Sequence, residues 1–142
     1  MRKIVVLSII LVFLIMIGLC GCIKSGKAIK FDDKKIFDFL FDNRYEQKHV
    51  VGTMSTFDYD YLSPDAPSSD SKVLTGTTED AAKEKIKDSF YTEEVYKGDN
   101  YTVKKGKNGR YFAKAYCNGV AFGIVIPNEE LLNKFISEFG VK

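Results

Sequence analysis

The feature that most constrains this chain is an uncharged, apolar run near its start, which extends from Ile4 to Leu19. Arg2 and Lys3 place positive charge directly before it, and only Ser8 and Gly18 interrupt its large apolar side chains. A short basic segment followed by such a run is the layout of a secretory signal. The run is shorter than the roughly 20 residues that a helix needs to cross a bilayer core. A cleaved signal is therefore favoured over an uncleaved membrane helix.

The end of this run, Leu19-Cys20-Gly21-Cys22, resembles the lipobox of bacterial and archaeal lipoprotein signals. The resemblance covers residues 1–22. It implies cleavage between Gly21 and Cys22 and attachment of membrane lipid to the Cys22 thiol. The rest of the chain would then be held on the outer face of the cytoplasmic membrane. The alternative is an uncleaved single-pass membrane protein with a cytoplasmic N-terminus, acting as a subunit of a membrane complex.

Charge and cysteine content narrow the classes of function. The chain has 21 Lys and Arg residues and 19 Asp and Glu residues, and Arg2 and Lys3 account for the excess. A chain that loses both with its signal is balanced in charge, so no nucleic-acid partner is expected. Cys117 is the one cysteine after Cys22, so a cleaved and lipidated chain forms no internal disulfide.

The sequence shows no obvious cluster of metal ligands or catalytic residues. His49 is the single histidine, and no cysteine lies near it in sequence to share a metal. Aspartates 58, 60, 65 and 70 suggest a weak calcium loop, but their spacing lacks the glycine and glutamate of an EF-hand. We therefore expect a solvated acidic loop, with no metal, no cofactor and no enzymatic activity.

The chain after the signal (residues 1–21) is predicted to hold one domain. Residues 22–31 are expected to be a lipidated N-terminus and tether, and residues 32–142 a single α+β extracytoplasmic domain. Periodicity predicts helices at about 33–44, 78–91 and 128–139. Alternation and turn residues predict strands at 49–59, 93–97, 101–105, 110–117 and 120–126. The first of these strands is expected to be followed by a long polar loop to Thr77, with a brief strand at Val73 and Leu74. These elements predict an antiparallel sheet of about four or five strands, with three helices packed mainly on one face, after the N-terminal apolar segment.

The strongest local signal in the domain is Asn118-Gly119, which lies between two alternating segments. This pair supplies the positive φ angles of a two-residue hairpin turn. The turn sets Cys117 opposite Val120 and Ala115 opposite Phe122, and these side chains are expected to face the core. This hairpin and the amphipathic helix after it, residues 110–139, resemble the PsbP-like extracytoplasmic domains. No function is carried over from that resemblance.

The other face of the same hairpin carries Phe112, Lys114 and Tyr116, and Tyr101 is expected to join them from the preceding strand. Aromatic rings with polar tips beside a lysine suit contact with a partner protein or a glycan, so this face is the candidate partner surface. Alternatively, the long loop or the helix that begins at Thr78 covers it. Taken together, the sequence predicts a membrane-anchored, non-catalytic binding or accessory lipoprotein.

Overall fold

The computed structural model describes residues 24–142. The expected signal, the cleavage position at Gly21 and the lipidated Cys22 lie outside the described residues. The described elements are, in chain order, β1 (Lys24–Gly26), α2 (Asp33–Asp42), β2 (Glu46–Gly52), β3 (Phe57–Ser63), β4 (Ala66–Thr75), α3 (Glu79–Lys85), β5 (Tyr91–Gly98), β6 (Tyr101–Gly106), β7 (Tyr111–Cys117), β8 (Val120–Ile126) and α4 (Glu129–Phe139).

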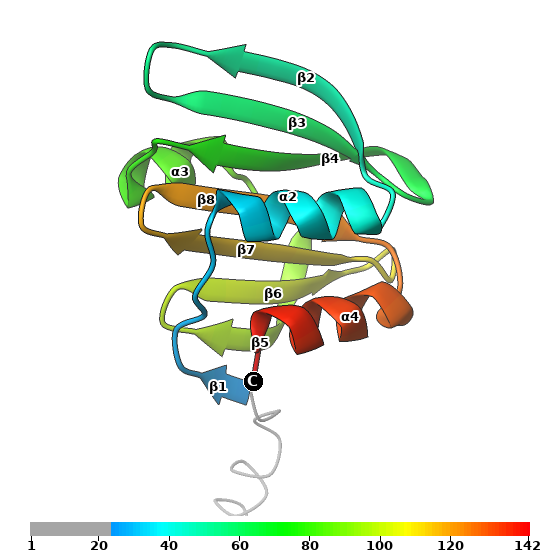
Figure 1. Ribbon diagram of the computed structural model, residues 1–142. Coiled ribbons are helices and arrows are strands. Elements are labelled where there is room, and N and C mark those ends of the chain that lie inside the picture. The colour runs from blue at the N-terminus through cyan, green and yellow to red at the C-terminus, as the bar shows by residue number, and fades with distance from the viewer. Residues whose placement is uncertain (1–23) are drawn as a thin grey trace, which may run out of the picture.

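The strands form one sheet in the order β1-β5-β6-β7-β8-β4-β3-β2 (Figure 1). Every neighbouring pair is antiparallel except β1 with β5, which is parallel. Within residues 24–142 the sheet thus has seven antiparallel strands and one short parallel edge strand. The prediction of about four or five strands is wrong, because the segment from 46 to 75 contributes three strands and the expected tether contributes another.

The strand predicted at 49–59 is in fact a hairpin of β2 and β3 that reverses at residues 53–56. The Thr53 N–H donates to the Thr56 carbonyl at 2.9 Å and closes the turn. No glycine, proline or asparagine lies within this turn, and the alternation of side chains continues through it. A turn without these residue types is hard to recognise in a sequence, so the sequence predicts a single long strand here.

Strand β4 occupies most of the segment that was expected to be a loop. Ser63 and Ser71 are buried there, with their hydroxyl oxygens 2.8 Å apart, and Ser71 Oγ accepts from the Val125 N–H at 2.9 Å. Because these hydroxyls find partners inside the sheet, a polar segment can be buried. Val73 and Leu74, expected to form a brief strand, lie within β4 and point to opposite faces.

The helices divide unequally between the two faces of the sheet (Figure 1). We call these the α2/α4 face and the α3 face, after the helices that cover them. On the α2/α4 face, the ring of Phe122 is fully buried and lies 4.9 Å from Phe31, 5.9 Å from Phe135 and 5.6 Å from Phe139, measured between centroids. The smaller apolar cluster on the α3 face includes Phe112. The main core therefore lies under two helices, and a second, thinner one lies under α3.

Both helices of the main core begin and end close to the predicted positions. Asp32 caps α2 by accepting from the Lys35 N–H at 2.8 Å. Asn128 caps α4 by accepting from the Leu131 N–H at 2.9 Å. Gly140 ends α4 in the left-handed conformation, with φ of 67°. Glycine adopts this conformation without steric cost, which confirms the predicted stop.

Helix α3 is shorter than the predicted range 78–91. Thr78 caps its start, and Ala82 and Ile86 are buried, as expected. The backbone of Ile86 is extended, however, so the helix ends at Lys85. Phe90 was expected to continue the apolar stripe, but it lies beyond the helix and is exposed.

The stretch expected to be a tether is, from Lys24 onward, part of the fold. β1 pairs with β5, and the side chains of Ile29 and Phe31 are buried in the main core. The C-terminus lies beside β1 (Figure 1), where the Tyr101 hydroxyl donates to the Lys142 carbonyl at 2.9 Å. Only one residue, Ile23, therefore separates the predicted lipid site from the edge of the sheet.

Candidate functional site

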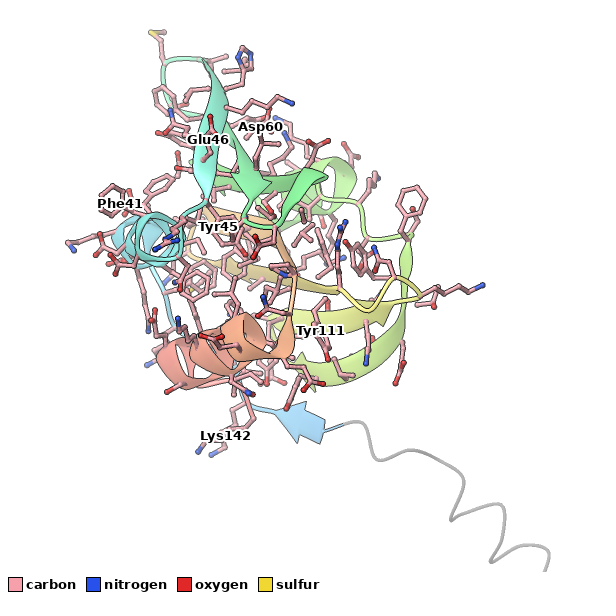
Figure 2. All side chains as sticks on the ribbon, turned by 90° about the vertical axis from the view of Figure 1, so that its right-hand side faces the viewer. Phe41, Tyr45, Glu46, Asp60, Tyr111 and Lys142 are labelled. Atoms are coloured by element: carbon pink, nitrogen blue, oxygen red, sulfur yellow. The ribbon has the colours of Figure 1, made fainter. Side chains whose placement is uncertain are left out.

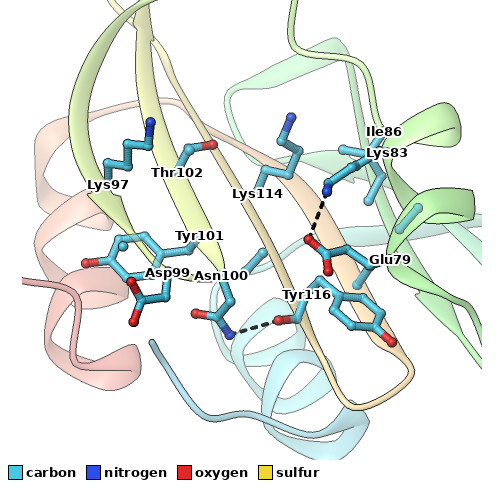
Figure 3. Close-up of a pocket in the computed structure, with 14 residues that line it drawn as sticks. Glu79, Lys83, Ile86, Lys97, Asp99, Asn100, Tyr101, Thr102, Lys114 and Tyr116 are labelled. Atoms are coloured by element: carbon cyan, nitrogen blue, oxygen red, sulfur yellow. Dashed lines mark hydrogen bonds and ion pairs between the residues drawn. The ribbon is translucent and has the colours of Figure 1, made fainter. Parts of the chain in front are cut away.

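A hollow of about 430 Å³ opens on the α3 face, between α3 and strands β5 to β7 (Figure 3). Its helical wall consists of Glu79, Ala82, Lys83 and Ile86. Glu79 is three and four residues from Ala82 and Lys83, so these three lie on one side of α3, and Ile86 follows directly after the end of the helix. The opposite wall is the sheet itself. The hollow is thus formed where a single short helix covers a wide sheet incompletely.

A glycine allows α3 to approach the sheet. A Cβ at Gly123 of β8 would collide with the side chain of Ile86 and the ring of Phe112. Because glycine has no Cβ, Ile86 can pack directly against the strand. Ile86 and Ala82 join Phe112, Ala121 and other residues in the apolar cluster of this face, and this contact fixes the helical wall of the hollow.

Three polar side chains cross the floor of the hollow in one row. Lys97 of β5 is in register with Thr102 of β6, and Thr102 is in register with Lys114 of β7. Residues in register on neighbouring strands point to the same face with Cβ atoms about 5 Å apart. Figure 3 shows these side chains on adjacent strands, with Glu79 and Lys83 across from them. The floor therefore places a threonine between two lysines.

Asp88, just after α3, anchors one end of this row. Its Oδ2 lies 3.1 Å from Lys114 Nζ and 3.0 Å from Lys104 Nζ. Burial alone would raise the pKa of this carboxyl, but hydrogen bonds from the two lysines outweigh burial and hold its pKa below the ordinary value. One carboxylate shared by two ammonium groups leaves a net positive charge. Since an ammonium has three donors, Lys114 retains hydrogen-bonding capacity.

Thr102 is the unusual member of the row. Its Oγ1 is buried, and no hydrogen-bond partner for it occurs within residues 24–142. A hydroxyl left in this state destabilises the folded protein by about 1–3 kcal/mol. By contrast, the buried hydroxyls of Ser63 and Ser71 both have partners. The buried hydroxyl that lacks a partner in the described residues thus belongs to a residue that lines the hollow.

The remaining charged groups of the hollow are partly neutralised. Lys83 Nζ lies 2.9 Å from Glu79 Oε1, which makes the α3 wall neutral. In the view of Figure 3, the Asp99 carboxylate points away from the Lys97 ammonium. No ion pair or hydrogen bond of the Lys97 side chain is found in the described part of the chain. The Lys97 ammonium is therefore the cation of the hollow that is most available to a ligand.

The structure divides the four residues of the candidate partner surface between the two faces of the sheet, although Tyr101, Lys114 and Tyr116 all line the hollow. Phe112, Lys114 and Tyr116 share the α3 face, as predicted. Phe112 is buried there, stacked on Tyr91 with 5.2 Å between ring centroids. Lys114 and Tyr116 are half-buried and line the hollow. Phe112 is covered by α3, as the alternative prediction for this face expected. The role of this face in binding stays a prediction.

Tyr101 lies on the α2/α4 face, and its predicted position is wrong. It is in register with Ala115, so it belongs to the main core, where it is buried. The reason is the β6–β7 turn, where Gly106 N–H donates to the Arg110 carbonyl and Gly109 has φ of 78°. This is a three-residue loop with a bulge. A change of one residue in register moves every side chain to the other face.

A second exposed feature is the end of the β2–β3 hairpin, at the sheet edge opposite β1 (Figures 1 and 2). Val50, Val51, Met54 and Phe57 are all exposed there. We call this set the hairpin tip. Every residue of β2, including His49, is exposed. Exposed apolar side chains gathered at one site are typical of contact surfaces.

Two of the four aspartates that suggested calcium, Asp58 and Asp60, form ion pairs with lysines. Asp58 Oδ2 lies 2.8 Å from Lys85 Nζ, and Asp60 forms an ion pair with Lys72. In the range 24–142, no group of three or more His, Cys, Asp or Glu residues is placed to hold a metal ion. These carboxylates therefore join α3 to β3 and β3 to β4 through lysines.

Comparison with known proteins returned no match to a family model, to a curated protein or to a solved structure. Residues 24–142 contain no helix with the length and apolar character needed to span a membrane.

Proposed function

We propose that this protein is a non-catalytic binding module, anchored by lipid at Cys22 on the outer face of the cytoplasmic membrane, and that the hollow beside α3 is its binding site. The observation that carries this proposal is that Thr102, a residue that lines the hollow, has a buried hydroxyl without a hydrogen-bond partner in the described chain. Functional sites commonly retain polar groups that lower stability. A bound ligand would supply the missing partner.

The position of β1 supports the anchored arrangement. Ser25 of β1 is in register with Lys97 on the floor of the hollow. Three residues of extended chain span about 10 Å, so a lipid on Cys22 would hold the hollow close to the membrane surface. The hairpin tip, at the opposite edge of the sheet, would then face away from the anchor.

The anchoring part is tested by Cys22→Ser in the full chain. The substitution removes the thiol, so we expect an unmodified protein that retains residues 1–21. Mass spectrometry of the membrane fraction distinguishes the two forms. A wild-type chain that still begins at Met1 with an unmodified Cys22 would contradict lipid anchoring and favour the single-pass alternative.

A second candidate function is that of a subunit in a membrane complex, and the hairpin tip favours it. Replacing Val51 and Met54 together by serine should leave the fold intact, because both side chains are exposed. The substitution should abolish recovery of a defined membrane protein that co-purifies with the wild type. Phe90→Ser is the matched control, since Phe90 is equally apolar and exposed but lies elsewhere. Equal loss in both variants would argue against a specific role for the hairpin tip.

A further inference from the structure

We infer that the hollow beside α3 binds an oxyanion, either a phosphate or a carboxylate group, between Lys97, Thr102 and Lys114. The inference rests on the proposed binding function and names the chemistry of its ligand. It depends on the cross-strand row, which places two ammonium groups on either side of one hydroxyl.

The donors of the row match an oxyanion. The Lys97 ammonium has no partner in the described residues, so all three of its N–H groups can donate. Lys114 uses one position on Asp88 at 3.1 Å and keeps the others. Hydrogen bonds between an ammonium and an anionic oxygen are about twice as strong as those between neutral groups.

The local balance of charge also favours an anion. Lys104 and Lys114 share the single carboxylate of Asp88, which leaves one positive charge uncompensated. Lys97 adds a second at the other end of the row, and the Asp99 carboxylate, which also lines the hollow, offsets one of the two, so a net positive charge remains. The α3 wall is neutral because Glu79 pairs with Lys83. A site of this sign and a volume of about 430 Å³ would accommodate a small anionic group.

The Thr102 hydroxyl gives the row a neutral donor in its middle. Its oxygen is covered in the free protein, so a ligand reaches it only when a flanking side chain moves. Lysine side chains are long and flexible, and Lys97 is exposed and its side chain makes no hydrogen bond or ion pair within residues 24–142. An entering anion would draw the Lys97 ammonium toward itself, and contact with the hydroxyl would require the atoms that cover it to shift.

Two sources could supply the anion, a free phosphate or carboxylate compound and the head group of an anionic lipid. The hollow lies next to β1 and hence, under the proposed function, near the membrane. Titration calorimetry on the full chain in neutral detergent distinguishes them. One arm uses inorganic phosphate, and the other compares the soluble lipids dihexanoyl phosphatidylglycerol and dihexanoyl phosphatidylcholine.

We expect saturable, equimolar binding of inorganic phosphate or of the phosphatidylglycerol. Lys97→Met and Thr102→Val should each weaken that binding by about tenfold, since tenfold corresponds to 1.4 kcal/mol. Lys107→Met removes the same charge from the exposed β6–β7 turn and should leave affinity unchanged. Lys114 is not the first choice for substitution because its contact with Asp88 also supports the fold. Tighter binding of the phosphatidylglycerol would identify a lipid head group, and tighter binding of phosphate a free anion.

Two results would overturn the inference. One is equal weakening by Lys107→Met and Lys97→Met, which would show non-specific attraction to surface charge. The other is no saturable binding of either phosphate probe. If a neutral sugar bound in the hollow instead, and Thr102→Val weakened that binding, the oxyanion inference would fail while the binding module of the proposed function would stand.

Discussion

The two faces of the sheet are covered by very different amounts of helix. On the α2/α4 face, Phe122 lies among aromatic rings from both helices and is fully buried. On the α3 face, a helix of seven residues covers a small apolar cluster and leaves a hollow lined by lysines and an unpartnered hydroxyl. The comparison suggests that one face supplies most of the stability, which leaves the other free to carry polar groups suited to binding.

The largest expected effect comes from Phe122→Ala. Removing a fully buried ring should lower the free energy of unfolding by about 3–5 kcal/mol, a large share of the 5–15 kcal/mol typical of a domain. Urea or guanidinium unfolding followed by circular dichroism measures the change. An unchanged midpoint would mean that the α2/α4 face is not the main core.

Phe112→Ala is the matching substitution on the α3 face. Its ring is buried as well, but its surroundings are a short helix and Tyr91, which can move inward to fill the space. We expect a loss of about 3 kcal/mol, at the lower end of the range for buried aromatic residues. If Phe112→Ala destabilised the protein more than Phe122→Ala under the same conditions, the claim that the α2/α4 face supplies most of the stability would be contradicted.

Asp88→Asn tests the polar side of the α3 face, with a smaller effect. The pKa of Asp88 is lowered in the folded state, so its charged form stabilises the fold above its unfolded pKa of about 3.9. That contribution is lost as pH falls through the lowered folded pKa. The variant should be about 1–2 kcal/mol less stable than wild type at pH 7. The difference in free energy of unfolding between wild type and variant should be smaller at pH 3 than at pH 7, and unfolding curves at the two pH values measure it. An equal difference at both would argue against a stabilising role for the Asp88 charge.

The sequence predicts the β7–β8 hairpin and α4 well because their signals are local. Asn118 and Gly119 have φ of 46° and 84°, and the pairing of Ala115 with Phe122 is confirmed. The predicted turn held the four residues 106–109, whereas the observed loop holds three, 107–109, and this difference in register placed Tyr101 on the wrong face. A bulged loop with glycine at its positive-φ position was the signal that could have corrected it.

The strands β2 to β4 were predicted only in part, as one strand at 49–59 and a brief strand at Val73 and Leu74. The buried serines of this region depend on partners far away in sequence, as the Ser71 hydroxyl depends on Val125. A segment read alone cannot show that such a hydroxyl will be satisfied. The same limit applies to the hollow. Lys97, Thr102 and Lys114 come from three strands, and only the register brings them together.

The most direct test of the contrast between the faces uses two buried hydroxyls of the same sheet. Ser71 Oγ accepts from Val125 N–H at 2.9 Å, whereas Thr102 Oγ1 has no partner within residues 24–142. Ser71→Ala should therefore destabilise the protein, since it leaves a buried N–H unpaired. Thr102→Val removes an unpaired hydroxyl and keeps the shape of the side chain. The measurement is the free energy of unfolding of Thr102→Val in the absence of ligand. We predict a gain of about 1 kcal/mol together with weaker phosphate binding; a loss of stability would contradict the claim that the α3 face gives up stability for binding.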